Sequence, residues 1–253
     1  MTTGNKIWFL SGLTLIAVVA VFLLAPIPQD IAFHNFADHR PFLGISNFGD
    51  VASNLAFLVV GITGLVLLRK ARLPAGMSAI YAVLFTGIIL TGLGSAYYHT
   101  APDNDRLVYD RIPMTIVFMS LFSATVAELI DQKAGVGLLV PLVLTGIISV
   151  LYWHYGELTG NGDLRLYFLV QYYPMLFIPL ILWLFYRPGQ NQGVRELVWV
   201  VVWYVIAKVL EHFDKEIYAA IKVISGHSLK HLAAAMATWW LVRMFRMKYI
   251  KSK

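Results

Sequence analysis

Eight long apolar runs divide this chain of 253 residues and leave only short connectors between them. A bilayer core is about 30 Å thick, and an α-helix needs about 20 apolar residues to cross it. The composition agrees with such crossings, because 58% of the residues are hydrophobic and only 13% are charged. We therefore expect a polytopic membrane helix bundle. The runs cover residues 7–25, 51–68, 78–98, 112–130, 136–151, 166–185, 197–210 and 231–245.

The connectors are too short for a second folded domain, so the sequence predicts a single all-α membrane domain over residues 1–253. The first run is long enough to span a bilayer and no A-x-A-like cleavage site follows it, which favours a transmembrane helix over a signal peptide. Runs 136–151 and 197–210 are short or polar at their edges. Three prolines in residues 26–49 exclude a long helix from that segment.

Basic residues concentrate on one set of connectors when the chain is threaded through eight spans. Because cytoplasmic loops are enriched in Lys and Arg, both termini are expected in the cytoplasm. The candidate site residues described below then fall on the non-cytoplasmic side. The net charge of +6 is thus explained by topology, and nucleic-acid binding is not indicated.

Polar residues interrupt two apolar runs in the segment GSAYYHTAPDNDRLVYDRIPM, residues 94–114. Ser95 and His99 are four residues apart and share a helix face. Asp110 follows across a short loop, and Pro113 is compatible with the first turn of a new helix. Taken alone, His99 is more often a hydrogen-bonded packing residue than a ligand. Asp110 is at least as readily a helix cap or the partner of a neighbouring arginine.

Two histidines, His227 and His231, are four residues apart in SGHSLKHLAAA. Both face one way if the last helix begins near Ser225, and the pair then makes half of a zinc site that a ligand from another helix can complete. The pattern is not HExxH, because no glutamate follows the first histidine. The chain has no cysteine, so only histidine and oxygen ligands remain for a transition metal. With His99, three ligands and an open fourth position are typical of a catalytic zinc that activates water for hydrolysis.

Small polar residues open the second apolar run at Asp50, Ser53 and Asn54. Helix capping by Asp50 and close packing by the other two are as plausible as a role in the site. In the third run, glycines up to Gly94 predict the close approach of a neighbouring helix.

Ionisable residues follow the seventh run at a spacing of three, as Lys208, Glu211 and Asp214. This spacing predicts a ladder along one helix face in which Lys208 pairs with Glu211. Charged groups in a span tend to face an interior cavity, and here support of the site is favoured over catalysis. His154 lies among interfacial aromatic residues and is interpreted as structural.

These motifs resemble the alkaline ceramidases, within the CREST superfamily that includes the adiponectin receptors. The resemblance is carried by SxxxH at Ser95 and His99, by Asp110 before a proline, and by HxxxH in the last run. The pair Ser53 and Asn54 and the run GLGSAYYH add to it. It extends from about residue 38 to the C-terminus, with the motifs in the same order.

The resemblance implies a seven-helix core over residues 38–253, to which residues 1–30 add one N-terminal transmembrane helix. The family has an acidic calcium-binding cluster before its first core helix. This chain offers Asp38 and Asp50 there, but Arg40 lies between them and could pair with Asp38, which disfavours Ca²⁺.

The resemblance also implies that His99, His227 and His231 hold Zn²⁺. Ser95 would then assist stabilisation of the oxyanion, and Asp110 would orient or deprotonate the attacking water. The expected activity is that of a ceramidase-like hydrolase of lipid metabolism, which releases a fatty acid from a ceramide, a sphingolipid, or from another N-acyl lipid. No protein partner is implied.

Two other functions remain open. A receptor or sensor of the adiponectin-receptor type would hold a structural zinc, and a fourth protein ligand closing the site would favour it. An ion or proton transporter would need Lys208, Glu211 and Asp214 to line a path to the other face. The remaining half of the bundle has almost no ionisable residues within its spans, which argues against transport.

Overall fold

The computed structural model describes residues 1–187 and 193–250, and this part of the chain is all-α, without a β-strand. Its elements in chain order are α1 (Thr3–Leu23), the 3-10 helix η1 (Ile31–His34), α2 (Phe48–Ser53), α3 (Leu55–Leu68), α4 (Met77–Thr100), α5 (Asn104–Leu129), α6 (Gln132–Leu158), α7 (Arg165–Phe185), α8 (Val194–His212), α9 (Asp214–Ile221) and α10 (Gly226–Tyr249).

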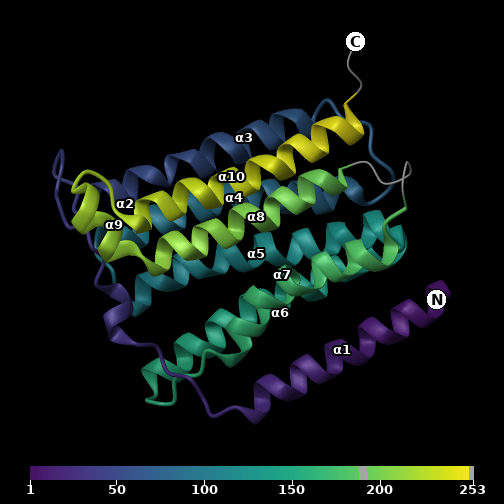
Figure 1. Cartoon of the computed structure of the whole chain (residues 1–253), viewed down its shortest axis with the longest axis horizontal. Coiled ribbons are helices and arrows are strands. Elements are labelled where there is room, and N and C mark those ends of the chain that lie inside the picture. Colours follow the sequence, from purple (N-terminus) through teal and green to yellow (C-terminus); the bar gives the residue numbers. More distant parts are fainter. Residues whose placement is uncertain (188–192, 251–253) are drawn as a thin grey trace.

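The long helices run side by side, as Figure 1 shows. Helix α4 packs against α3 and α5, α10 packs against α8 and α3, and α6 and α7 continue the bundle beyond α5. The short helices α2 and α9 lie together at one end, whereas α1 begins and α10 ends near the opposite end. Helix α1 forms the outer edge, where it packs against α7.

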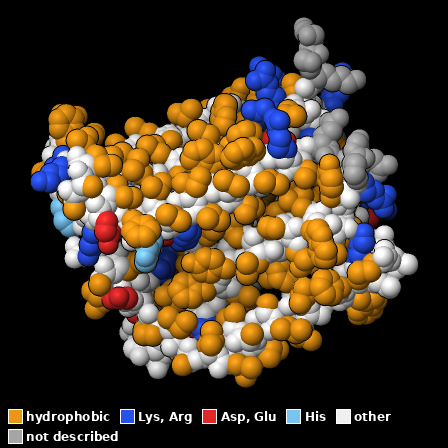
Figure 2. Space-filling view, viewed as in Figure 1, with side chains coloured by type: hydrophobic (Ala, Val, Ile, Leu, Met, Phe, Trp, Pro, Cys, Tyr) orange, Lys and Arg blue, Asp and Glu red, His pale blue; other side chains and the backbone are white. Residues whose placement is uncertain are grey.

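All eight apolar runs are helical, but within the described residues six helices are long and apolar enough to cross a membrane. These are α1, α2 with α3, α4, α5, α6 and α7. The other two runs form α8 and α10, which are more polar because α8 carries Lys208 and Glu211 and α10 carries both motif histidines. Figure 2 shows the same face of the molecule as Figure 1. Hydrophobic side chains cover the middle of this face, and charged side chains gather toward its two ends.

The close approach expected for the glycine-rich helix is confirmed. A Cβ atom built on Gly94 of α4 would overlap the carbonyl oxygen of Tyr109 in α5. A Cβ atom added at Gly87 of α4 would lie 3.1 Å from the Val117 side chain of α5. Glycine therefore brings the backbones of α4 and α5 into contact near Ser95.

The expected start of the helix around Asp110 is wrong. Helix α5 begins at Asn104, where the side chain of Asp103 caps it by accepting from the backbone N–H of Arg106 at 2.7 Å. Asp110 therefore lies in the second turn, and Pro113 is inside the helix. The prediction used the start of the apolar run, whereas the capping carboxylate sets the start of the helix.

Candidate metal centre

Three buried histidines from two distant parts of the chain meet at the end of the bundle that carries α2 and α9. His99 comes from the last turn of α4, and His227 and His231 from the start of α10. Their ring centroids form a nearly equilateral triangle with sides of 4.8, 4.9 and 4.8 Å. One nitrogen from each ring lies within 4.8 Å of the others.

Helix α10 begins where the sequence predicts, and this aims both of its histidines inward. Ser225 is the N-cap, and its hydroxyl accepts from the backbone N–H of Ser228 at 2.9 Å. The backbone N–H of His227 donates to Asp214 at 2.8 Å. Two of the free N–H groups of this first turn are thereby satisfied without water.

The donor atoms fit a metal ion. Nε2 of His99 and Nε2 of His227 face each other at 3.2 Å, and Nδ1 of His99 is buried without a hydrogen-bond partner. Three imidazoles held at this separation in a dry interior form a nitrogen donor set that binds a transition metal. His99, His227 and His231 could therefore hold a metal ion.

His231 is oriented by a hydroxyl from α2. Ser53 Oγ lies 2.8 Å from its Nδ1 and also donates to the carbonyl oxygen of Asp50 at 3.0 Å. A hydroxyl has one proton, so Ser53 must accept the Nδ1 proton of His231. This leaves Nε2 of His231 with its lone pair free. Asn54 also donates to the Asp50 carbonyl, at 2.7 Å, and so supports the same turn.

Asp50 does not cap its helix with its side chain. Its carboxylate is buried and accepts from Ser225 at 3.1 Å and from Ser228 at 2.6 Å. It therefore ties α2 to the start of α10. Of the two alternatives that the sequence leaves open for Asp50, helix capping is therefore excluded, because its partners come from a helix far along the sequence.

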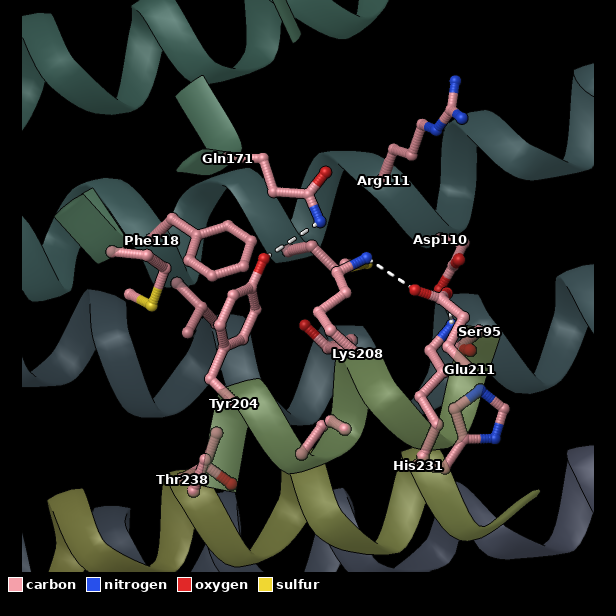
Figure 3. A pocket seen from close by; sticks show the side chains of 18 of the residues that line it. Ser95, Asp110, Arg111, Phe118, Gln171, Tyr204, Lys208, Glu211, His231 and Thr238 are labelled. Atoms are coloured by element: carbon pink, nitrogen blue, oxygen red, sulfur yellow. Dashed lines mark hydrogen bonds and ion pairs between the residues drawn. The ribbon is translucent and has the colours of Figure 1, made fainter. Parts of the chain in front are cut away.

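Ser95 and Asp110 lie side by side next to the histidines. The contact between α4 and α5 at Gly94 brings the Ser95 hydroxyl to the Asp110 carboxyl, with which it interacts. In Figure 3 Ser95, Asp110 and His231 gather at one side of a pocket. The structure thus brings together a hydroxyl, a carboxylate and an imidazole that lie on three helices.

This pocket is a mainly apolar cavity of about 350 Å³ between α4, α5, α7, α8 and α10. It reaches from His231 to Leu241 on α10, ten residues that span about 15 Å of helix. Its walls include Ile88, Phe118 and Met175. Gln171 of α7, which the sequence analysis does not single out, also lines the cavity and donates to Tyr204 at 3.3 Å.

The expected pairing of Lys208 with Glu211 is confirmed at 2.6 Å. A second cation, Lys230, binds the same carboxylate at 2.8 Å and lies 3.4 Å from Nε2 of His227. Sequence reasoning missed Lys230, although it directly precedes His231 in the motif. The ladder prediction is wrong at Asp214, because α8 ends at residue 212 and Asp214 starts α9.

Asp214 binds backbone groups, unlike Lys208 and Glu211, which pair with each other. Its carboxylate accepts the backbone N–H groups of Ala37 at 2.9 Å and of His227 at 2.8 Å. His154 binds Asp105 at 2.8 Å, away from the three clustered histidines.

Asp38 is paired with Arg40 as the sequence suggests. Arg40 donates to it from Nε at 2.8 Å and from Nη2 at 2.7 Å. These hydrogen bonds hold the pKa of Asp38 below its ordinary value. The guanidinium thus binds both carboxylate oxygens of Asp38, as the sequence suggests.

The fold and the site define the class: a helical membrane bundle with a buried cluster of three histidines beside a serine and an aspartate. Over residues 43–252 the sequence matches the family described as Ceramidase, and the chain belongs to this family. The expected resemblance is thus confirmed. No curated protein and no solved structure matches.

Proposed function

We propose that this protein is a zinc-dependent lipid amide hydrolase that releases a fatty acid from a ceramide or another N-acyl lipid. Family membership supports an amide hydrolase. The observation that carries the proposal is that the Ser95–Asp110 pair and His231, one of the three converging imidazoles, line the polar end of an apolar cavity within the bundle.

The donor set favours an open site. Among the described residues the cluster contains His99, His227 and His231 and no fourth His, Asp or Glu. Three protein ligands with a free position are typical of catalytic zinc, whereas structural sites are closed by four. When bound, the ion supplies Lewis-acid polarisation of a carbonyl and activation of a water. This favours a hydrolase over a receptor with a structural zinc.

Asp110 is the proposed proton carrier. It lines the cavity, and among the described residues it forms no ion pair with Lys or Arg. A carboxylate without a cationic partner is free to accept the proton of the attacking water and to return it to the leaving amine. The neighbouring hydroxyl of Ser95 donates to the carbonyl oxygen as negative charge develops there.

Other polar residues have positioning tasks in this proposal. Ser53 fixes the tautomer of His231, while Asp50 and Asn54 fix the turn that carries Ser53. Glu211 forms an ion pair with Lys208 and another with Lys230, so its carboxylate compensates positive charge next to the histidines. A transport path would need a continuous row of ionisable groups, but Asp214 is occupied by two backbone N–H groups.

The substrate follows from the shape of the cavity. An acyl chain fits along the apolar walls, which run about 15 Å down α10, while its amide stays beside Ser95. Because the cavity is enclosed by helices of a membrane bundle, we propose that the lipid enters from the bilayer.

The test is metal analysis of the purified protein, combined with fatty-acid release from ceramides, N-acyl amino acids and phospholipids in detergent. We expect about one zinc per chain and release from at least one amide. Protein with a full metal complement that releases no fatty acid from any amide would favour the receptor function instead.

We further propose that the metal centre faces the non-cytoplasmic side. Near the opposite end of the bundle the described basic residues include Arg69, Lys70, Arg72, Arg243, Arg246 and Lys248, and the predicted cytoplasmic residues Lys251 and Lys253 lie outside the described part. Labelling of single cysteines introduced at Asn161 and at Lys70 in intact cells would test this orientation, and only Asn161→Cys should react from outside.

A further inference from the structure

A buried arginine beside the catalytic pair has no carboxylate partner. The Arg111 side chain is 4% exposed, and among the described residues no Asp or Glu pairs with it. Its Nη2 donates to Gln29 at 2.6 Å, whereas Nη1 is buried without a partner. An unpaired guanidinium inside a membrane bundle is costly, and such residues are usually functional.

Aromatic rings surround this guanidinium. Its central carbon lies 4.2 Å from the ring of Trp153, 4.6 Å from that of Tyr167 and 5.6 Å from that of Phe33. Cation–π contacts of this kind stabilise the charge but accept no hydrogen bond in the plane of the guanidinium. The Tyr167 side chain also interacts with the guanidinium, but Nη1 itself has no hydrogen-bond partner.

The cavity extends to this cage. Phe33, Tyr167 and Arg111 line it together with Ser95 and Asp110. In Figure 3 Asp110 points toward Ser95 and Glu211, and Arg111 projects from the same helix away from them. A group bound to Arg111 would thus lie beyond the catalytic pair, not among the apolar walls.

The charges lining the cavity do not balance. Cations outnumber carboxylates by three to two, with Arg111, Lys208 and Lys230 against Asp110 and Glu211. Glu211 already pairs with both lysines. Arg111 is thus the one cation of the lining that forms no ion pair with a carboxylate among the described residues.

We propose that Arg111 binds the carboxylate of an anionic amphiphile in this cavity. Guanidinium is well suited to this, because its planar N–H groups match a carboxylate. The inference rests on the proposed function and narrows its substrates: the carboxylate is the head group of an N-acyl amino acid. The carboxylate of the released fatty acid has the same chemistry, and the experiment distinguishes the two.

The experiment compares wild type with Arg111→Met in metal-loaded protein. The substrates are N-oleoylglycine and the uncharged N-oleoylethanolamine. We expect the KM for N-oleoylglycine to rise about tenfold or more, with little change for N-oleoylethanolamine. Arg111→Lys should recover part of the loss, because it keeps the charge. Arg106→Met is the control on the same helix, since Arg106 binds Thr100 outside the cavity lining, and it should leave both KM values unchanged.

A second arm measures inhibition by oleate and by oleyl alcohol. If Arg111→Met weakens inhibition by oleate alone and does not change either KM, the carboxylate bound is that of the product. Equal effects on both substrates and both inhibitors would overturn the proposal.

A third measurement separates this inference from the proposed function. Binding of N-oleoylglycine to chelator-treated protein needs no turnover, and Arg111→Met should weaken it about tenfold. If wild type cleaves no amide but shows this binding difference, the hydrolase proposal fails and the carboxylate site stands. Unchanged binding in Arg111→Met, in protein that unfolds at the wild-type temperature, would overturn the site.

Discussion

The hydroxyl of Ser53 lies 2.8 Å from Nδ1 of His231 and joins α2 to the metal centre. Since its proton is donated to the carbonyl oxygen of Asp50, the imidazole proton is held on Nδ1. Nε2 of His231 is thereby kept as a lone-pair donor. Residues separated by 178 positions in the chain thus fix one tautomer.

Ser53→Ala should weaken metal binding about 10- to 100-fold, because groups that orient a metal-bound histidine contribute about this much to affinity. The measurement is a competition titration against a chromophoric zinc chelator. Ser123→Ala is the control, since Ser123 is buried in α5 and donates to Gly135 instead. Equal metal affinities for Ser53→Ala and wild type would show that Ser53 does not orient His231 for metal binding.

His99→Ala and His231→Ala should each strip the metal, since each leaves two of three ligands. Elemental analysis of purified protein measures this directly. His154→Ala should retain the wild-type metal content, because His154 binds Asp105 away from the cluster. A full complement of metal in both ligand variants would show that the ion is held elsewhere.

Asp110→Asn should keep the metal and reduce turnover about 10²- to 10⁴-fold, because the amide cannot carry the proton. Ser95→Ala should cost about 10²- to 10³-fold if its hydroxyl stabilises the oxyanion. Fatty-acid release and metal content are measured on the same preparations. An active Asp110→Asn protein would contradict the assigned proton transfer.

Gly94→Ala should separate α4 from α5, since the added methyl group would overlap the carbonyl oxygen of Tyr109. We expect a loss of about 1 to 3 kcal/mol in the free energy of unfolding, as for overpacking elsewhere. Turnover should fall too, because this contact holds Ser95 against Asp110. Gly137→Ala is the matched control: a Cβ there meets nothing within 4 Å, and its unfolding in detergent should stay near that of wild type.

The pairing of Asp38 with Arg40 should make the free energy of unfolding depend on pH. The pKa of Asp38 is lowered in the folded protein. The ion pair therefore stabilises the folded state fully at pH values above the pKa of Asp38 in the unfolded chain, which is about 3.9. The stabilisation is lost as the pH falls through the lower, folded pKa. Asp38→Asn should therefore reduce the free energy of unfolding by about 1 kcal/mol at neutral pH. The gap between variant and wild type should close in acid below the folded pKa, as unfolding curves at several pH values would show.

Much of this architecture could be predicted from local patterns in the sequence. Apolar runs of about 20 residues predict spanning helices, and the start of α10 follows from Ser225 as its cap. The spacing of His227 and His231 predicts that they share a face. Each of these inferences concerns residues within a few turns of one helix.

Two errors are local and concern helix ends, at Asn104 and at His212, whereas the others involve partners that are distant in the chain. Asp50 was open to a local interpretation, but its carboxylate binds Ser225 and Ser228 on the last helix. Lys230 is unremarkable in sequence and gains meaning only because Glu211 of α8 lies opposite. Arg111 stands out only once it is known that no carboxylate among the described residues forms an ion pair with it. Spacing cannot supply such information, because it depends on how the helices pack.

The donor nitrogens of His99 and His227 face each other although 128 positions separate them along the chain. During synthesis α4 is made before α10, so a growing chain holds only one of the three rings until α10 has been made. A metal ion that needs all three rings could therefore bind only after α10 has joined α4. Docking of α10 would then complete the helix bundle and the donor set in the same step.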